Sequence, residues 1–304
     1  MTPPDALAAP TKTTAAIAPA PTPVDAARPR PGMPKYLAIF RVSLAERMTY
    51  RGDFLLATIF RFLPMVTTIL LWQAIYVGAG RKDSDLAGFR YHEMIAYLLL
   101  THISRMFSSM PGLAAGIARE VREGTLKRYL LQPIDMIAYL LTYRVAHKVA
   151  YIATSILPYG LLFLVCQVTL GIFDRFPGPA TLGAYAISLI LGFLVGFFFE
   201  ASVGMVGFWF LEVTSLLYIV MTLNFFISGQ MLPLDLLPQP WSGLLKILPF
   251  QYMAYFPAVV FLGKVAGTEL WLLLLGESLW AIVFMVLARS LFRMGLRRYS
   301  AFGG

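Results

Sequence analysis

Residues 118–134 read AREVREGTLKRYLLQPI, a charge-dense stretch in an otherwise apolar chain. Apolar runs precede and follow it. Each charge at the centre of a bilayer would cost roughly 2.5–3.5 kcal/mol on insertion scales. The stretch is therefore predicted to lie in water, and the apolar runs around it in a membrane. We interpret it as a contact surface for a soluble partner.

The composition of the whole chain agrees with a membrane protein. The 304 residues are 58% hydrophobic and 13% charged, and the mean hydropathy is +0.70. Soluble domains typically carry about 25% charged residues. The net charge of +9 is more simply explained by basic residues that set membrane orientation than by nucleic-acid binding, so no nucleic-acid partner is expected.

Two parts are expected. Residues 1–34 are rich in Pro, Ala and Thr and bury too little apolar surface to fold, which predicts a disordered tail. Residues 35–304 form the membrane domain. It begins with an amphipathic helix over 35–53 that is expected to lie in the membrane interface, with packing on soluble protein as the alternative.

The predicted fold class is an all-α membrane protein with six transmembrane helices. A helix needs about 20 apolar residues to cross the hydrocarbon core. Six segments meet this length: 55–78, 94–112, 150–173, 182–210, 213–232 and 270–292.

Basic residues predict the orientation of these spans. With the N-terminus inside, the cytoplasmic segments carry about three times as many Lys and Arg residues as the outer ones. Both termini and the 118–134 stretch are therefore expected in the cytoplasm, in a multi-pass protein of the plasma or inner membrane.

Residues 228–263, between the fifth and sixth segments, form an unusual connection. Five prolines prevent one continuous helix, yet the sequence stays apolar and aromatic. This pattern favours short re-entrant or interfacial helices on the outer side, with Trp241, Tyr252 and Tyr255 at headgroup level, over an ordinary loop.

The sequence shows no signature of catalysis. It contains no GxxxxGK[ST] phosphate-binding loop, no HExxH and no Cys or His cluster at metal-ligand spacing. We therefore expect no enzyme, with no catalytic residue, metal or cofactor in this chain.

The 118–134 stretch also has an apolar side. Ile117, Val121, Leu126, Leu130 and Ile134 recur at roughly helical spacing. A short cytoplasmic helix of this kind should lie on the bilayer or insert into a groove of a partner, and its mixed charge disfavours the bilayer. A solvated turn without a partner is the alternative.

Glu120 to Pro133 resembles the coupling-helix region of ABC type-2 permeases, the membrane subunits of ATP-binding-cassette transporters. Ser228 to Pro233, Leu248 to Phe250 and Gly295 to Ser300 are similar to the same family. The resemblance covers about residues 35–304, and the long tail departs from it.

The resemblance implies a division of labour. A separate soluble ATPase subunit would bind ATP and Mg, and two permease subunits, identical or sister chains, would form the substrate path, which we expect to export its substrate. The ATPase would dock on ten residues of this stretch: Arg119, Glu120, Arg122, Glu123, Gly124, Thr125, Leu126, Lys127, Arg128 and Tyr129.

Four ionisable residues fall inside the expected spans: Arg61, Arg105, Glu200 and Glu277. Such residues usually face protein or water. We expect Glu200 to pair with Arg105 or Arg61 in the cytoplasmic half. Glu277 has no evident partner. Gly192 and Gly196 form a GxxxG pattern, for which packing within the subunit is the first expectation and a dimer contact the second.

A self-sufficient secondary transporter or channel is the alternative function, and a membrane scaffold a third. A secondary transporter is expected to contain internal repeats, and no convincing repeat relates the two halves.

Overall fold

The computed structural model describes residues 34–49, 51–78, 86, 88–173, 176–210 and 213–303, without the side chains of 51–59, 61 and 300–303. The predicted tail thus lies outside the described residues, apart from residue 34. Within them the fold is helical, and the only β-type pairing is an isolated bridge between Leu86 and Phe89. The all-α prediction is confirmed.

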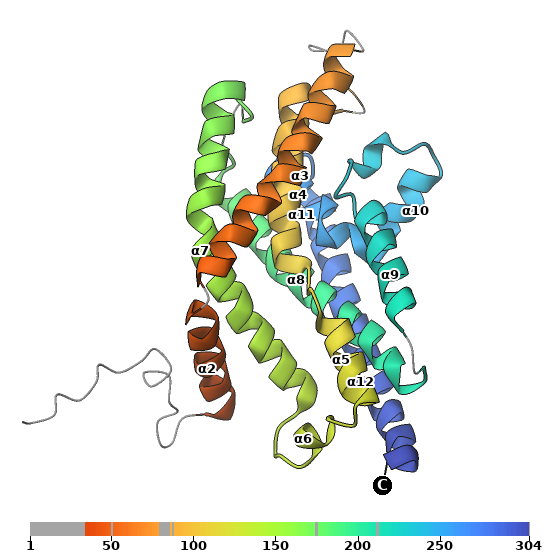
Figure 1. The fold of residues 1–304 in the computed structure, drawn as a ribbon. Coiled ribbons are helices and arrows are strands. Elements are labelled where there is room, and N and C mark those ends of the chain that lie inside the picture. Colours follow the sequence, from red (N-terminus) through yellow and green to blue (C-terminus); the bar gives the residue numbers. More distant parts are fainter. Residues whose placement is uncertain are drawn as a thin grey trace, which may run out of the picture.

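Long helices run side by side along the molecule (Figure 1). Three of them are long and apolar enough to cross a membrane: α7 (Met136–Leu170), α8 (Pro179–Met205, continued by η1, Val206–Phe208) and α12 (Gly267–Gly303). The other expected spans correspond to α3 (Arg51–Gly78), α4 (Tyr91–Ser108) and α9 (Thr214–Ile227).

Two of the predicted boundaries were wrong. Helix α7 begins at Met136, well before residue 150, because Asp135 caps it through a hydrogen bond from the Ala138 N–H at 2.7 Å. Helix α9 has only 14 residues, about 21 Å, against a hydrocarbon core of about 30 Å. It ends early because Gly229, at φ 79°, turns the chain.

Helix α8 lies at the centre, against α12, α4, α5 (Leu113–Arg122) and α11 (Tyr255–Phe261). Its glycines permit this close packing. A Cβ at Gly196 would lie 2.0 Å from the Ser108 carbonyl oxygen, and one at Gly204 would lie 2.9 Å from the Ala114 Cα. The expectation that the small residues pack within the subunit is confirmed.

The connection after α9 folds back into the protein. It contains η2 (Leu234–Leu236), α10 (Trp241–Ile247), η3 (Pro249–Met253) and α11. Tyr252 and Tyr255 are buried in the protein, because η3 and α11 pack on α8, and their headgroup level stays a prediction. Tyr255 donates a hydrogen bond to Asp235 at 2.8 Å, which satisfies its hydroxyl inside the protein. Trp241 is exposed.

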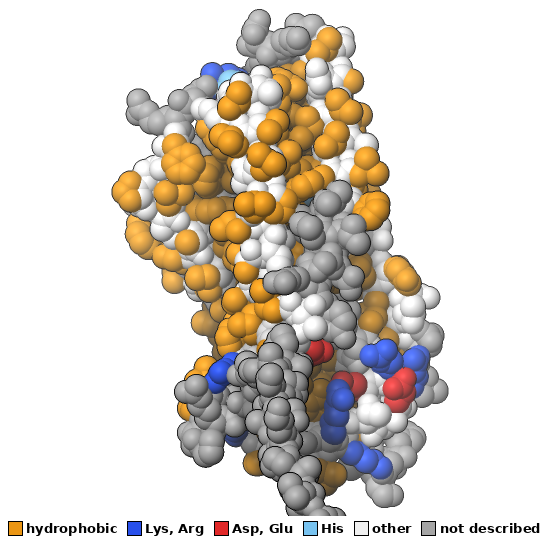
Figure 2. Space-filling view, turned by 60° about the vertical axis from the view of Figure 1, so that its left-hand side comes forward, with side chains coloured by type: hydrophobic (Ala, Val, Ile, Leu, Met, Phe, Trp, Pro, Cys, Tyr) orange, Lys and Arg blue, Asp and Glu red, His pale blue; other side chains and the backbone are white. Residues whose placement is uncertain are grey.

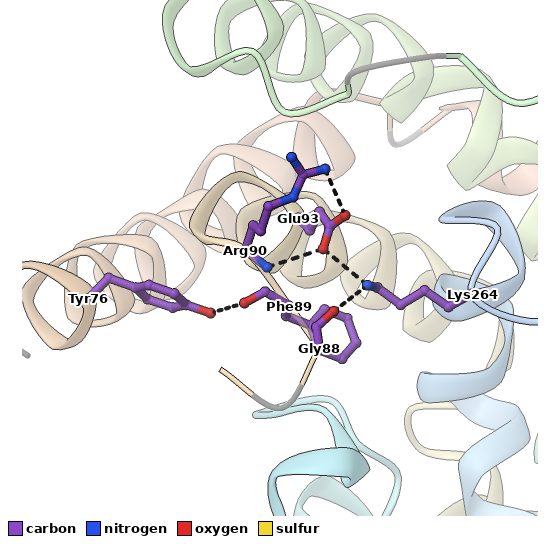
Figure 3. Close-up of polar contacts among 6 residues, drawn as sticks. All are labelled: Tyr76, Gly88, Phe89, Arg90, Glu93 and Lys264. Carbon is purple, nitrogen blue, oxygen red and sulfur yellow. Dashed lines mark hydrogen bonds and ion pairs between the residues drawn. The ribbon is translucent and has the colours of Figure 1, made fainter. Parts of the chain in front are cut away.

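A polar network joins α3, α4 and the loop before α12 (Figure 3). Lys264 Nζ lies 3.0 Å from Glu93 Oε2 and 2.6 Å from the Gly88 carbonyl oxygen, and 4.2 Å from the centre of the Phe89 ring. Tyr76 donates to the Phe89 carbonyl at 2.7 Å. These contacts fix the connection between α3 and α4.

The expected interfacial helix is α2 (Lys35–Thr49), and it packs along the lower part of α7. Lys35 donates to the Pro133 carbonyl at 2.7 Å, and Arg47 hydrogen-bonds the hydroxyl of Tyr143. Hydrophobic side chains cover most of the upper surface, and Lys, Arg, Asp and Glu gather at the lower end (Figure 2).

Candidate functional site

The charged stretch forms α5, a turn, and the short helix α6 (Lys127–Leu130), which we call together the α5–α6 segment (residues 113–134). It lies at the lower end of the molecule, near the C-terminal end of α12 (Figure 1). Gly124, at φ 71°, reverses the chain where α5 ends, a conformation that glycine adopts without strain.

The apolar side of the segment packs on this chain. Ile117, Val121 and Leu126 are buried in a cluster with α8 and η1 residues such as Met205 and Phe208. The interpretation that this apolar face serves the bilayer or a partner groove was therefore wrong for these three residues, because the neighbouring helices already cover them. Leu126, one of the expected docking residues, holds the segment in place instead.

An ion pair and hydrogen bonds within the segment join Glu120, Arg128 and Tyr129. Arg128 pairs with Glu120 and donates to the Tyr129 hydroxyl at 2.8 Å, and that hydroxyl lies 3.3 Å from Glu120 Oε1. Burial, and then the charge of Glu120, raise the pKa of Tyr129 to about 12, so its hydroxyl keeps its proton at neutral pH. Tyr129 is buried, so like Leu126 it positions the segment rather than forming its surface.

The outer surface of the segment carries the remaining charges. Six of the expected docking residues are exposed: Arg119, Arg122, Glu123, Thr125, Lys127 and Arg128. Beside them, Leu130 and Leu131 are 48% and 85% exposed. The expected docking set stopped at Tyr129 and did not include Leu131. The sequence did indicate an exposed leucine here, because two adjacent leucines on a short helix cannot both face the same core.

Two basic residues of α7 hold the chain where α4 ends. Lys148 Nζ lies 2.6 Å from the Ser109 carbonyl oxygen, and Arg144 Nη1 lies 3.0 Å from that of Pro111. Lys148 also donates to the carbonyl of Met106, one of the last carbonyls of α4, which lack partners within the helix. The beginning of the α5–α6 segment is thereby attached to α7.

The expected pair of Glu200 and Arg105 is close but not in direct contact. Arg105 lies near enough for its charge to act on Glu200, yet no ion pair joins these two described residues. The guanidinium of Arg105 lies 3.5 Å from Ser108 Oγ and 3.7 Å from Met253 Sδ. The side chain of Arg61 is outside the described residues.

Glu277 is fully buried between α12 and α8. Neither carboxylate oxygen has a hydrogen-bond partner among the described residues, and the hydroxyl of Ser188 beside it has none either. No described Lys or Arg acts on it.

An apolar pocket of about 240 Å³ lies between α5, α8 and α9. Glu200, Thr214 and Asn224 are among its polar lining residues, and Phe199 and Met221 are among the apolar ones. The described residues contain no group of three His, Cys, Asp or Glu side chains that could hold a metal ion.

Comparison with protein families identifies the class of this chain. Residues 62–303 match the ABC-2 family transporter protein model, and the chain belongs to this family. It is therefore a membrane permease of an ATP-binding-cassette transporter, and the family implies partnership with an ABC ATPase. A search of curated proteins finds no match.

Proposed function

We propose that this permease forms the substrate path of an exporter and is driven by a separate ATPase that docks on the α5–α6 segment. The observation that carries the proposal is the exposed surface of this segment, with Leu130 and Leu131 next to six charged or polar side chains. Exposed apolar residues surrounded by charges are typical of a partner contact. ATP and Mg bind the ATPase, and the permease itself catalyses no reaction.

The contacts of the segment connect it to other helices, to which its movement is transmitted. Lys148 and Arg144 attach its beginning to α7, and Asp135, just after its end, binds Arg289 of α12 at 2.6 Å. Movement of the docked surface would therefore reach α4, α7 and α12 together.

We propose six spans, with α3, α4 and α9 joining the three membrane-length helices. Helix α2, the α5–α6 segment and the end of α12 lie at one end of the molecule (Figure 1), which supports a shared cytoplasmic side in the plasma or inner membrane. The short helices after α9 would complete the fifth span and return from the outer side.

A second permease subunit, identical or a sister chain, would complete the path. Helix α9 supports this proposal, because large apolar side chains such as Tyr218, Met221 and Phe226 are exposed on it and only Asn224 is buried. The pocket lined by Glu200 and Asn224 lies beside α5, at the cytoplasmic end of the path. An amphiphilic substrate entering there from the inner leaflet fits outward transport.

The docking proposal is tested with Leu131→Ser and Glu123→Lys in the full chain. The matched control is Ile247→Ser on α10, which removes an apolar side chain that is 70% exposed at the other end. Leu131→Ser and Glu123→Lys are expected to lose most of the co-purifying P-loop ATPase and the ATP hydrolysis of the complex, while Ile247→Ser keeps both. Equal retention by all three variants contradicts docking at this surface. Transport by the purified chain in proteoliposomes without an ATPase would instead favour a secondary transporter.

A further inference from the structure

The carboxyl group of Glu277 lies where two long helices pack on each other. Helices α8 and α12 run side by side (Figure 1), and both Glu277 on α12 and Ser188 on α8 have an exposed fraction of 0%. Ser188 is close enough to act on the carboxyl group, but it is not placed for a hydrogen bond, and neither group has another partner among the described residues. Helix α8, η3 and residues 267–299 of α12 are all described, so the surroundings of Glu277 are defined.

Tyr252 of η3 crosses between the same two helices, and two glycines make room for it. A Cβ at Gly192 on α8 would stand 2.8 Å from the Tyr252 carbonyl oxygen and 3.5 Å from Glu277 Oε1. A Cβ at Gly276 on α12 would stand 2.7 Å from the Tyr252 hydroxyl oxygen. A carboxyl group, a carbonyl and two hydroxyls are therefore gathered at one point of the interface between α8 and α12.

The neighbouring elements supply no positive charge to Glu277. The elements that pack most on α12 are α8, η1 and η3, and none of them contains Lys, Arg or His. Tyr252 is a titratable group within electrostatic reach, whereas Glu200, the acidic residue of α8, lies about three turns beyond Ser188. An ionised carboxylate buried without a partner is strongly unfavourable, so the charge of Glu277 has to be neutralised by a species from outside the chain.

We propose that Glu277, Ser188 and the carbonyl of Tyr252 bind one small monovalent cation, a sodium ion or a proton, between α8 and α12. A sodium ion would take these oxygens as ligands, because hard cations prefer oxygen. A proton would reside on Glu277, which would then donate a hydrogen bond to Ser188 or to the Tyr252 carbonyl. Either cation is taken from water and returned to it.

The burial of this site links the cation to helix movement. Because Glu277 has no exposed surface, its cation is released only when α8 and α12 separate. Release during the transport cycle rests on the function proposed above. Binding itself is a property of the permease alone and is measured without an ATPase.

Thermal unfolding of the purified full chain in detergent tests the sodium ion. Sodium chloride is compared with choline chloride at equal ionic strength and neutral pH. An ion that binds only the folded state raises the melting temperature as its concentration rises. For sodium, this rise is expected in the wild type and in Glu269→Gln, which removes an exposed carboxyl group of the same helix. Glu277→Gln, with nearly the same shape, should lose it.

Infrared spectra of the same samples test the proton. A protonated carboxyl group has a C=O stretching band that a carboxylate lacks. In sodium-free buffer at neutral pH, a proton on Glu277 gives this band in the difference between the wild type and Glu277→Gln, and not in the difference between the wild type and Glu269→Gln. Loss of the band on adding sodium would show that the two cations exchange at one site, which supports the proposal.

One combined result overturns the proposal: an equal response of the wild type and Glu277→Gln to sodium, together with no acid band from Glu277. If Glu277→Gln does not fold, Ser188→Ala replaces it. This variant should raise the sodium concentration at half of the shift by roughly tenfold, or change the frequency of the acid band, and a variant with neither change contradicts the site. Leu131→Ser should leave both measurements unchanged, so a failure of ATPase docking is distinguishable from a failure of the cation site.

Discussion

Asp135 and Arg289 connect the start of α7 to α12 through a single carboxylate. One oxygen of Asp135 caps α7 at 2.7 Å from the Ala138 N–H, and the other lies 2.6 Å from Arg289 Nη1. Asp135→Ala should lower the free energy of unfolding by about 1–2 kcal/mol, mostly from the lost cap. Asp135→Asn keeps the cap and should cost less than about 1 kcal/mol, since the pair is partly exposed.

Thermal or denaturant unfolding in detergent measures this difference. Arg289→Gln removes the same ion pair and should match Asp135→Asn. A loss in Arg289→Gln as large as that in Asp135→Ala would mean that the ion pair, and not the cap, holds the two helices.

Gly196 tests how tightly α8 packs on the end of α4. Gly196→Ala would place a methyl group 2.0 Å from a backbone carbonyl of Ser108, so the helices must separate. The expected cost is about 1–3 kcal/mol or more. Gly183→Ala on the same helix is the control, because no atom lies within 4 Å of its Cβ position. It should be neutral or stabilise by about 0.5–1 kcal/mol. Similar unfolding of the two variants would disprove the close contact.

Glu93 makes the stability of the polar network around Lys264 sensitive to acid. Burial pushes the pKa of Glu93 up, but hydrogen bonds and charge from Lys264 and Arg90 outweigh it and hold the pKa below its ordinary value of 4.5. The folded state therefore binds this proton more weakly than the unfolded state. The contribution to stability is present above pH 4.5 and is lost as pH falls through the lowered pKa.

Glu93→Gln removes this dependence. It should lower stability at neutral pH and flatten the profile below pH 4.5, the ordinary value for Glu. Melting temperatures between neutral and acidic pH test the expectation. A wild type and a variant with parallel acid profiles would show that Glu93 does not carry the dependence.

Glu200 and Glu277 offer a matched pair of carboxylates inside one bundle. Arg105, Arg144 and Lys148 all act on Glu200, so Glu200→Gln leaves buried positive charge without its counterpart. It should destabilise folding or reduce transport, by roughly 2 kcal/mol or more in stability. Glu277→Gln removes no described ion pair and should be tolerated. Unchanged assembly and export in Glu200→Gln would contradict the electrostatic role.

The all-helical fold and the position of the charged stretch were predictable from the composition and from the spacing of hydrophobic residues. The start of α7 was not predictable, because Arg144 and Lys148 indicate a polar segment in any hydropathy window. In the fold both side chains hydrogen-bond to carbonyls near the end of α4. The burial of Tyr255 depends on Asp235, which is distant enough in sequence that no local pattern joins them.

The charged stretch was recognised by its residue types, but its two sides were not separated. Leu126 and Tyr129 turn inward, because the chain reverses at Gly124, and Leu131 turns outward for the same reason. Buried and exposed side chains thus occur on both sides of Gly124, where the chain changes direction. Helical periodicity cannot follow a face across such a turn.

The attachment of the α4 end to Arg144 and Lys148 has a mechanical consequence. Both donors come from the first half of α7, while the end of the α5–α6 segment runs directly into the start of α7. The segment is thus a loop attached at both ends to the same helix, α7. Displacement of the segment cannot be absorbed by stretching this loop, so it passes to α7 and to the helices on which α5 packs.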